Sequence, residues 1–275
     1  MPEIPDLEAI RGFLNQRLPG VRVERAEVLI PVVFRIPKDD FIRTIEGNSF
    51  GETQRRGKFL IFTLESDHLL VINAMLTGRF QYLPVRQAGL QPGDKRHART
   101  CMVLGLKNGW ELRYVDARLM GKIYLVPADK LLDVPQFAEM EADALDVSQD
   151  EFAQRIRRFR GQIKSTLVNH RFVAGIGNAY ADEILFAAGL HPYRKRTTLS
   201  DDDIARLYQS MQKVFAWATP IVAEQMRDEL NYEERRDFLK IHRRGGEPCP
   251  VCGTRISEIT AGQRITNFCR NCQPG

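Results

Sequence analysis

The sequence lacks any apolar run that approaches the roughly 20 residues of a membrane-spanning helix. It also lacks low-complexity tracts and internal repeats. Its first ten residues, MPEIPDLEAI, carry three acidic side chains and no apolar segment of the kind that a secretory signal requires. We therefore expect a cytoplasmic protein that has no membrane partner.

Cysteine is scarce and unevenly placed. Four of the five cysteines lie in the last 27 residues as two CxxC pairs, Cys249/Cys252 and Cys269/Cys272, with sixteen residues between the pairs. Two disulfides or four unrelated thiols are the alternatives, but disulfides are rare in cytoplasmic proteins and unrelated thiols would not form matched pairs. Two such pairs can complete a tetrahedron around zinc, and four cysteines leave no open coordination position. The pattern predicts one structural zinc ion in a finger over residues 241–275.

No charge of one sign dominates, since 40 basic and 35 acidic side chains leave a net charge of +5 and a pI of about 9.0. The basic residues form short clusters that are spread along the chain. These clusters are QRRGK (54–58), DKRHAR (94–99), RIRRFR (155–160), YRKR (193–196) and IHRR (241–244). Any one of them is typical of a solvated surface. Five that recur beside glycine and aromatic residues favour a nucleic-acid backbone as the partner.

The two halves of the chain differ in patterning. Before residue 130, short apolar or alternating runs broken by Gly, Asn and Asp are typical of antiparallel strands. These runs are VRVERAEVLI, KFLIFTLE, HLLVINAML, TCMVLGL, WELRYVD and GKIYLV. One helix precedes them, with Pro5 in its first turn and Pro19-Gly20 at its end. Its apolar residues Leu7, Ile10, Leu14 and Leu18 follow the 3.6-residue period. After residue 148 the pattern is helical, and Ser200 can cap a long helix that extends to about Val222.

We therefore predict an α+β protein. An N-terminal antiparallel sandwich or barrel, with an N-terminal helix, spans residues 1–130. The acidic segment 131–148 has no clear period and is interpreted as a linker. A helical domain over 149–240 and the zinc finger over 241–275 complete the chain.

Pro2 gives the N-terminus a chemical possibility that no internal residue has. Removal of Met1 would expose a secondary amine, and α-amino groups have a reference pKa of about 8, against about 10.4 for lysine. The positive end of the following helix would lower this pKa further. Attack of such an amine on a sugar C1′ gives an iminium ion, the electron sink that eliminating a 3′ phosphate requires. In isolation, a proline at position 2 is usually only an exposed terminus.

Three segments occur in the order found in one enzyme family. They are the start MPEIPDLE, the segment VAGIGNAYADEILFAAGLHP (173–192) and the terminal CPVCG, GQR and FCRNCQ motifs. In these segments the chain resembles formamidopyrimidine-DNA glycosylase and endonuclease VIII, nearly from end to end. The resemblance implies a bacterial, nucleoid-associated repair enzyme with an N-terminal β-sandwich, a helix–two-turn–helix and a zinc finger. It would act as a monomer on double-stranded DNA that contains oxidised bases or abasic sites.

The resemblance also implies roles for individual residues. Pro2 would be the nucleophile, and Glu3 the acid/base group that assists opening of the sugar ring. Lys58, in RRGKF, would bind the phosphate beside the lesion, although in isolation it could equally be a surface lysine at a strand end. Arg264, just past the turn of the hairpin between the cysteine pairs, would hold the phosphates that flank the flipped nucleotide. Asn178, in GIGNAY, would contact a phosphate at the helix–two-turn–helix.

Three further residues are expected to contact DNA. Met75, in NAMLTGRF, and Arg118, in DARLMG, match the family's first two gap-filling residues. From spacing alone Met75 would be an ordinary core methionine. His97, in the basic cluster DKRHAR, completes the set.

The chain departs from the family's pattern at several positions. Asp6 replaces a glutamate, Asn73 a frequent histidine, Ala117 a proline and Leu119 a second arginine, while Met120 replaces the aromatic wedge of the purine-specific branch. These positions bear on the choice of lesion. They leave the expected lyase residues intact.

Ile4 fills a position that is glycine in the endonuclease VIII branch. We therefore expect a bifunctional DNA glycosylase and abasic-site lyase that removes oxidised purines (8-oxoguanine and formamidopyrimidines) and cleaves the strand by β,δ-elimination. One alternative is an endonuclease VIII-like glycosylase for oxidised pyrimidines. The other is a non-catalytic paralogue that binds damaged DNA, and the intact Pro2-Glu3 pair argues against it.

Overall fold

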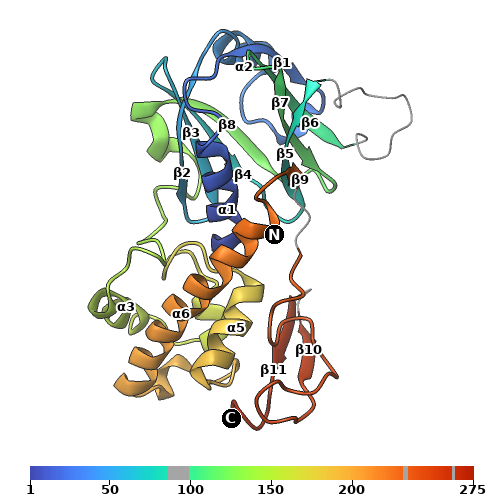
Figure 1. Ribbon diagram of the computed structural model, residues 1–275. Helices are drawn as coiled ribbons and strands as arrows, with labels where there is room; N and C mark the ends of the chain where they lie inside the picture. The colour runs from blue at the N-terminus through green and yellow to red at the C-terminus, as the bar shows by residue number, and fades with distance from the viewer. Residues whose placement is uncertain (86–98, 232–234, 262–263) are drawn as a thin grey trace. The chain divides into compact units, whose positions relative to one another are not determined.

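The computed structural model describes residues 1–85, 99–231, 235–261 and 264–275 (Figure 1). The chain divides into two compact units. The first comprises Met1–Ala138 with Thr219–Glu234, and the second comprises Glu139–Ala218 with Arg235–Gly275. No helix within the described ranges combines the length and the apolar character that crossing a bilayer demands.

The first unit is built on two antiparallel sheets that lie in two layers (Figure 1). One sheet has the order β1-β6-β7-β5-β9, formed by Val23–Val28, Thr100–Leu106, Trp110–Asp116, Gly78–Pro84 and Leu230–Asn231. The other has the order β2-β3-β4-β8, formed by Phe50–Arg56, Phe59–Leu64, His68–Asn73 and Lys122–Pro127. The rings of Phe62 in β3 and Phe80 in β5, both fully buried, lie 6.1 Å apart and join the two layers. The predicted β-sandwich is confirmed.

Helix α1 (Ile4–Asn15) buries its apolar stripe, as the period predicts, and it ends four residues before Pro19. The Asn15 amide accepts from Thr53 N at 2.7 Å and donates to Thr53 O at 2.8 Å, which fastens the end of the helix to strand β2. A second helix, α2 (Lys38–Ile45), follows β1 along the chain.

The second unit is helical, with a two-stranded hairpin near its end. Its helices are α3 (Gln149–Ile156), α4 (Ile163–Leu167), α5 (Asn178–Ala188) and the first part of α6 (Asp201–Gln225). A short 3₁₀ turn covers Arg196–Thr198 in this unit, and two others cover Pro31–Val33 and Ala128–Asp133 in the first unit. Strands β10 (Ser257–Ala261) and β11 (Arg264–Phe268) form the hairpin.

Ser200 caps helix α6 as the sequence predicts. Its hydroxyl accepts from Asp203 N at 3.1 Å, and the Asp203 carboxylate accepts from Ser200 N at 3.2 Å. Each side chain thus satisfies a backbone donor that the first turn of a helix leaves without an intrahelical partner. The long helix begins at a defined residue for this reason.

Candidate active site and nucleic-acid interface

The N-terminal residues are held by the first turn of α1. Glu3 is the N-cap, and the Asp6 carboxylate accepts its N–H at 2.8 Å while the Glu3 side chain accepts the N–H of Asp6. Pro2 is buried, and Glu3 and Asp6 are 2% and 0% exposed. The shorter Asp6 side chain therefore closes the capping box and fixes the backbone of Glu3. The positive end of the α1 dipole lies at this same terminus.

Lys58 lies in the two-residue turn Gly57-Lys58 between β2 and β3. Gly57 has a φ of 58°, the left-handed conformation that such tight hairpins need and that glycine adopts without strain. Arg55 ties the turn to α1, because its Nε donates to Glu8 Oε1 at 2.5 Å and its guanidinium also donates to Gly57 O at 3.0 Å. The half-buried Lys58 thus has a fixed place relative to the helix that carries Glu3.

Met75 and Arg118 belong to two loops that are in direct contact, β4–β5 and β7–β8. Met75 is half-buried with a φ of 49°, and its N–H donates to Asn73 Oδ1 at 3.0 Å. Arg118 has an exposed side chain, and its N–H donates to Thr77 Oγ1 at 3.0 Å. Asn73, one of the departures from the family's pattern, supplies the acceptor that closes the Met75 turn. His97 lies outside the described residues.

The four cysteines of the CxxC pairs meet in one cluster. Their sulfur atoms all lie within 4.8 Å of one another, with Cys249 and Cys272 at 3.8 Å and Cys252 and Cys269 at 3.4 Å. All four thiols are free of disulfides. A zinc ion with four Zn–S bonds of about 2.3 Å places its sulfurs about 3.8 Å apart, so the cluster fits a tetrahedral zinc site.

The hairpin brings Arg264 next to the start of α5. Arg264 is exposed and lies opposite Ala261, at the first residue of β11. The carbonyl of the next residue, Ile265, accepts from Asn178 Nδ2 at 2.8 Å. Because an amide nitrogen carries two hydrogens, Asn178 retains a second N–H for a further acceptor. Gly175, before the helix, has a φ of 106°, a backbone conformation that glycine adopts without strain.

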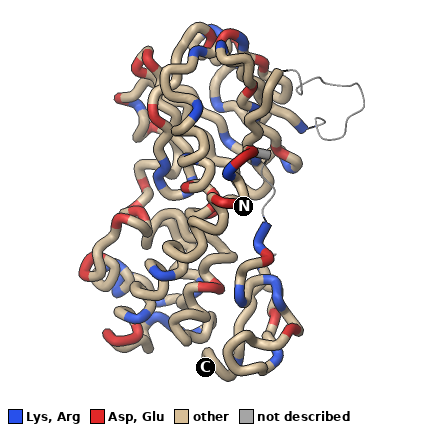
Figure 2. Tube along the Cα trace, in the orientation of Figure 1, with Lys and Arg blue, Asp and Glu red and all other residues tan. Residues whose placement is uncertain are grey.

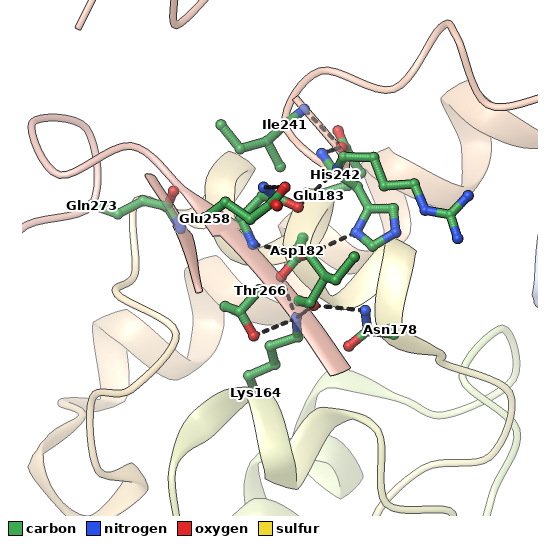
Figure 3. Close-up of polar contacts among 12 residues, drawn as sticks. Lys164, Asn178, Asp182, Glu183, Ile241, His242, Glu258, Thr266 and Gln273 are labelled. Carbon is green, nitrogen blue, oxygen red and sulfur yellow. Dashed lines mark hydrogen bonds and ion pairs between the residues drawn. The ribbon is translucent and has the colours of Figure 1, made fainter. Parts of the chain in front are cut away.

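A buried ionic cluster fastens the hairpin to α4 and α5 (Figure 3). Lys164 Nζ lies 2.6 Å from Asp182 Oδ1 and donates to Ile265 O and Thr266 Oγ1, each at 2.9 Å. The other oxygen of Asp182 lies 2.7 Å from His242 Nδ1. Lys164, Asp182 and His242 are 7%, 1% and 7% exposed. Such a cluster fixes one docking geometry, because a displaced partner would leave a charge buried alone.

Glu183 fastens the segment that enters the finger. Its carboxylate accepts three backbone N–H groups, from Lys240 at 3.0 Å and from Ile241 and His242 at 2.9 Å each (Figure 3). Burial raises the pKa of Glu183, although these hydrogen bonds act in the opposite direction. Sequence reasoning missed Lys164, Asp182 and Glu183. Their signal was charge inside apolar helical segments, the two acids of AYADEILFAA above all.

Several arginines of the predicted basic clusters have acidic partners. Arg155 pairs with Glu151 and Glu141, Arg157 with Asp201, Arg194 with Asp203 and Arg244 with Glu247. Figure 2 shows the two signs of charge interspersed along the trace. The clusters are therefore partly neutralised. Arg264, at the start of β11, is exposed.

Three family models match this chain in sequence order. The formamidopyrimidine-DNA glycosylase N-terminal domain matches residues 1–123, the formamidopyrimidine-DNA glycosylase H2TH domain matches 139–228, and a zinc finger found in FPG and IleRS matches 246–275. The last match and the sulfur cluster agree, so the C-terminal segment is a zinc finger whose four cysteines are positioned to bind one metal ion.

Relatives of known name match over the whole chain. A formamidopyrimidine-DNA glycosylase from Pelotomaculum thermopropionicum is 35% identical, with 99% of each chain covered. One from Symbiobacterium thermophilum is 34% identical, covering 100% of this chain and 90% of its own. Two solved structures of Lactococcus lactis FPG match with a TM-score of 0.88 at 25% identity over 100% of both chains. One is a mutant in complex with Fapy-dG containing DNA, and the other is the wild type with DNA containing N7-benzyl-Fapy-dG.

Proposed function

Because the chain belongs to the formamidopyrimidine-DNA glycosylase family, we propose that it is a bifunctional glycosylase and abasic-site lyase that removes oxidised purines from double-stranded DNA. The observation that carries the proposal is the buried Pro2-Glu3 pair at the head of α1, held by the Asp6 capping box. The Fapy-dG DNA bound by the Lactococcus lactis relative supports oxidised purines as the substrate.

Pro2 supplies the nucleophile. Once Met1 is removed, the secondary amine of Pro2 attacks C1′ of the damaged nucleotide. The bond from C1′ to the base breaks, and its electron pair leaves on the base, which takes up a proton. Glu3 gives a proton to the sugar ring oxygen, so that the ring opens and an iminium ion joins Pro2 to C1′. Helix α1 favours the free amine over its protonated form, because a second positive charge at the positive end of its dipole is unfavourable.

The iminium ion then serves as the electron sink for strand cleavage. Loss of a proton from C2′ sends electrons towards the iminium while the 3′ phosphate leaves, which is β-elimination. A second elimination expels the 5′ phosphate, and hydrolysis frees Pro2. The product is a gap with phosphates at both ends.

Three residues would hold the DNA backbone during these steps. Lys58 would bind the phosphate next to the lesion from its fixed turn, and Arg264 would bind flanking phosphates from the hairpin. Asn178 would use its second amide N–H. Phosphate contacts of this kind position the DNA without reading its sequence. The four cysteines would hold a zinc ion that supplies no chemistry to the reaction, and its binding would keep folded the hairpin that carries Arg264.

Met75 and Arg118 would enter the stack when the damaged nucleotide is extruded. Extrusion costs a few kcal/mol in lost stacking and pairing, and side chains that fill the gap offset part of this cost. The half-buried thioether of Met75 suits the apolar faces of the stacked bases in such a gap. The exposed guanidinium of Arg118 suits the polar edges of the bases there.

A panel of duplexes that each hold one lesion tests the proposal. We expect the fastest excision from duplexes with 8-oxoguanine or a formamidopyrimidine, followed by products with phosphates at both ends of the gap. Faster excision of an oxidised pyrimidine such as thymine glycol would assign the chain to the endonuclease VIII type of activity. Binding of every duplex without cleavage would leave only a damaged-DNA-binding role.

A further inference from the structure

The Met75 and Arg118 loops share one buried carboxylate, that of Asp116 at the end of β7. We propose that Asp116 and Thr77, named here the Thr77–Asp116 clasp, are positioning residues that present Met75 and Arg118 to the DNA as one unit. The inference rests on the proposed function, because it concerns how the gap-filling side chains are aimed.

The clasp is a closed set of hydrogen bonds between the two loops. Asp116 Oδ1 accepts from the Thr77 hydroxyl at 2.5 Å and from Arg118 N at 3.2 Å, and Arg118 N also donates to Thr77 Oγ1 at 3.0 Å. Asp116 Oδ2 accepts from Gly121 N at 2.6 Å. Asp116 is 0% exposed, and a carboxylate is stable at such a position only while its hydrogen bonds are made. Separating the loops would remove donors from a buried charge.

The backbone of both loops is held in an unfavourable conformation. Met75 has a φ of 49° and Leu119 a φ of 55°, and this left-handed region is unfavourable for a residue with a side chain. Two hydrogen bonds oppose this strain: Met75 N to Asn73 Oδ1 at 3.0 Å, and Leu119 N to Asp116 O at 3.3 Å. Such strain persists only where the surroundings determine the backbone, and it recurs at functional sites.

Both loops also close on the same aromatic ring. A Cβ added at Gly78 would lie 2.1 Å from Tyr114 Oη, and one at Gly121 would lie 1.9 Å from it. Tyr114 itself is 0% exposed. The fully buried Tyr114 therefore lies against both loops that the clasp joins.

The outer side of the joined loops carries the side chains that would meet DNA. Leu76 and Met120 are 38% and 39% exposed, and they flank the half-buried Met75 and the exposed Arg118. Because Thr77 and Asp116 contact both loops, a force on Met75 during insertion is resisted by the Arg118 loop as well. Without the clasp each loop would have to be ordered separately when the nucleotide is extruded, which lowers the rate of excision.

Thr77→Val tests the clasp with little change in volume, and Thr77→Ser restores the hydroxyl. We expect Thr77→Val to slow single-turnover excision from an 8-oxoguanine duplex about 10-fold, as expected from losing two hydrogen bonds. Cleavage of a single-stranded abasic site, which needs no extrusion, should stay within about 2-fold. Thr77→Ser should recover most of the duplex rate. Thr63→Val is the matched control, because it removes a hydroxyl that donates to Glu52 O elsewhere in the same sandwich.

A double variant separates positioning from general stability. If Thr77 acts by aiming Met75, Met75→Ala should slow duplex excision less in the Thr77→Val background than in the wild type. Three results would each overturn the inference. They are equal slowing by Met75→Ala in both backgrounds, equal loss of rate by Thr77→Val on duplex and single-stranded substrates, and an unchanged duplex rate in Thr77→Val. Failure of the wild type to excise 8-oxoguanine would instead overturn the proposed function, so the two failures are distinct.

Discussion

Replacing Lys164 with methionine should undo the docking of the zinc finger while leaving its metal in place. The variant removes the ammonium that contacts Asp182 Oδ1, Ile265 O and Thr266 Oγ1, and the Asp182 side chain is fully buried. The four cysteines that bind the metal make none of these contacts. Docking and metal binding are therefore separable by this one change.

The contacts set the size of the effect. Breaking a buried ion pair by removing one partner costs about 3–5 kcal/mol, because the remaining charge stays buried. His242 still contacts the other oxygen of Asp182, which places the expected loss near the lower end, about 3 kcal/mol. A loss of that size lowers the docking equilibrium constant by roughly a hundredfold.

Hydrogen–deuterium exchange measures this opening directly. The amides of Ile241, His242 and Asn267 donate to Glu183 or Asp182, so they report whether the finger is docked. In Lys164→Met we expect these amides to exchange roughly a hundredfold faster, with one zinc per chain retained and weaker binding of abasic-site DNA. Lys213→Met, at an exposed position of α6, should match the wild type. Unchanged protection in Lys164→Met, or loss of zinc together with protection, would refute the reasoning.

Four further variants test other parts of the molecule. Cys269→Ser should lose zinc and DNA affinity together, because the cluster holds the hairpin folded, and normal DNA binding by zinc-free protein would contradict the role of Arg264. Arg264→Ala should weaken binding to every lesion about equally and reduce the slope of log K against log salt by about one, whereas Asn178→Ala should weaken binding with little change in slope. The pKa of Asp203 lies below its usual value, because the Ser200 N–H and the guanidinium groups of Arg206 and Arg194 outweigh the opposing effect of burial. A carboxyl group with a lowered pKa stabilises the fold at pH values above its pKa in the unfolded state, about 3.9, and this effect is lost as the pH falls through its pKa in the folded state. Asp203→Asn should therefore lower the free energy of unfolding by about 1 kcal/mol at pH 6 and by clearly less at pH 3, as measured by urea titration.

Apolar patterning predicted the elements whose residues are apolar on at least one face. The segments TCMVLGL and WELRYVD match β6 and β7 at both ends, and Ser200 caps α6 as expected. Strands β2 (FGETQRR) and β5 (GRFQYLP) were missed, because charged and glycine residues interrupt the alternation of apolar and polar residues. Pairing with neighbouring strands compensates for their weak intrinsic preference for the strand conformation. Helix α2 (KDDFIRTI) was missed as well, because it is short and only two of its residues, Phe41 and Ile45, are buried.

The candidate site divides in a similar way. The cysteine cluster was predictable, because metal-ligand spacing is a local property of the chain. The contacts of Asn178 with Ile265 and of Lys164 with Ile265 and Thr266 join residues 87 to 102 positions apart. No local sequence pattern predicts contacts over such a separation. The Asp6 capping box, by contrast, lies within four residues and could have been predicted from Glu3 and Asp6 together.

Trapping with borohydride tests the central claim most directly. Borohydride reduces an iminium ion to a stable amine, so its addition during the reaction should join the enzyme covalently to an abasic-site duplex. Mass mapping of the digested adduct is expected to place the DNA on Pro2, with Met1 absent. An adduct on a lysine such as Lys58, or no adduct with an abasic-site duplex that the enzyme binds, would contradict the account.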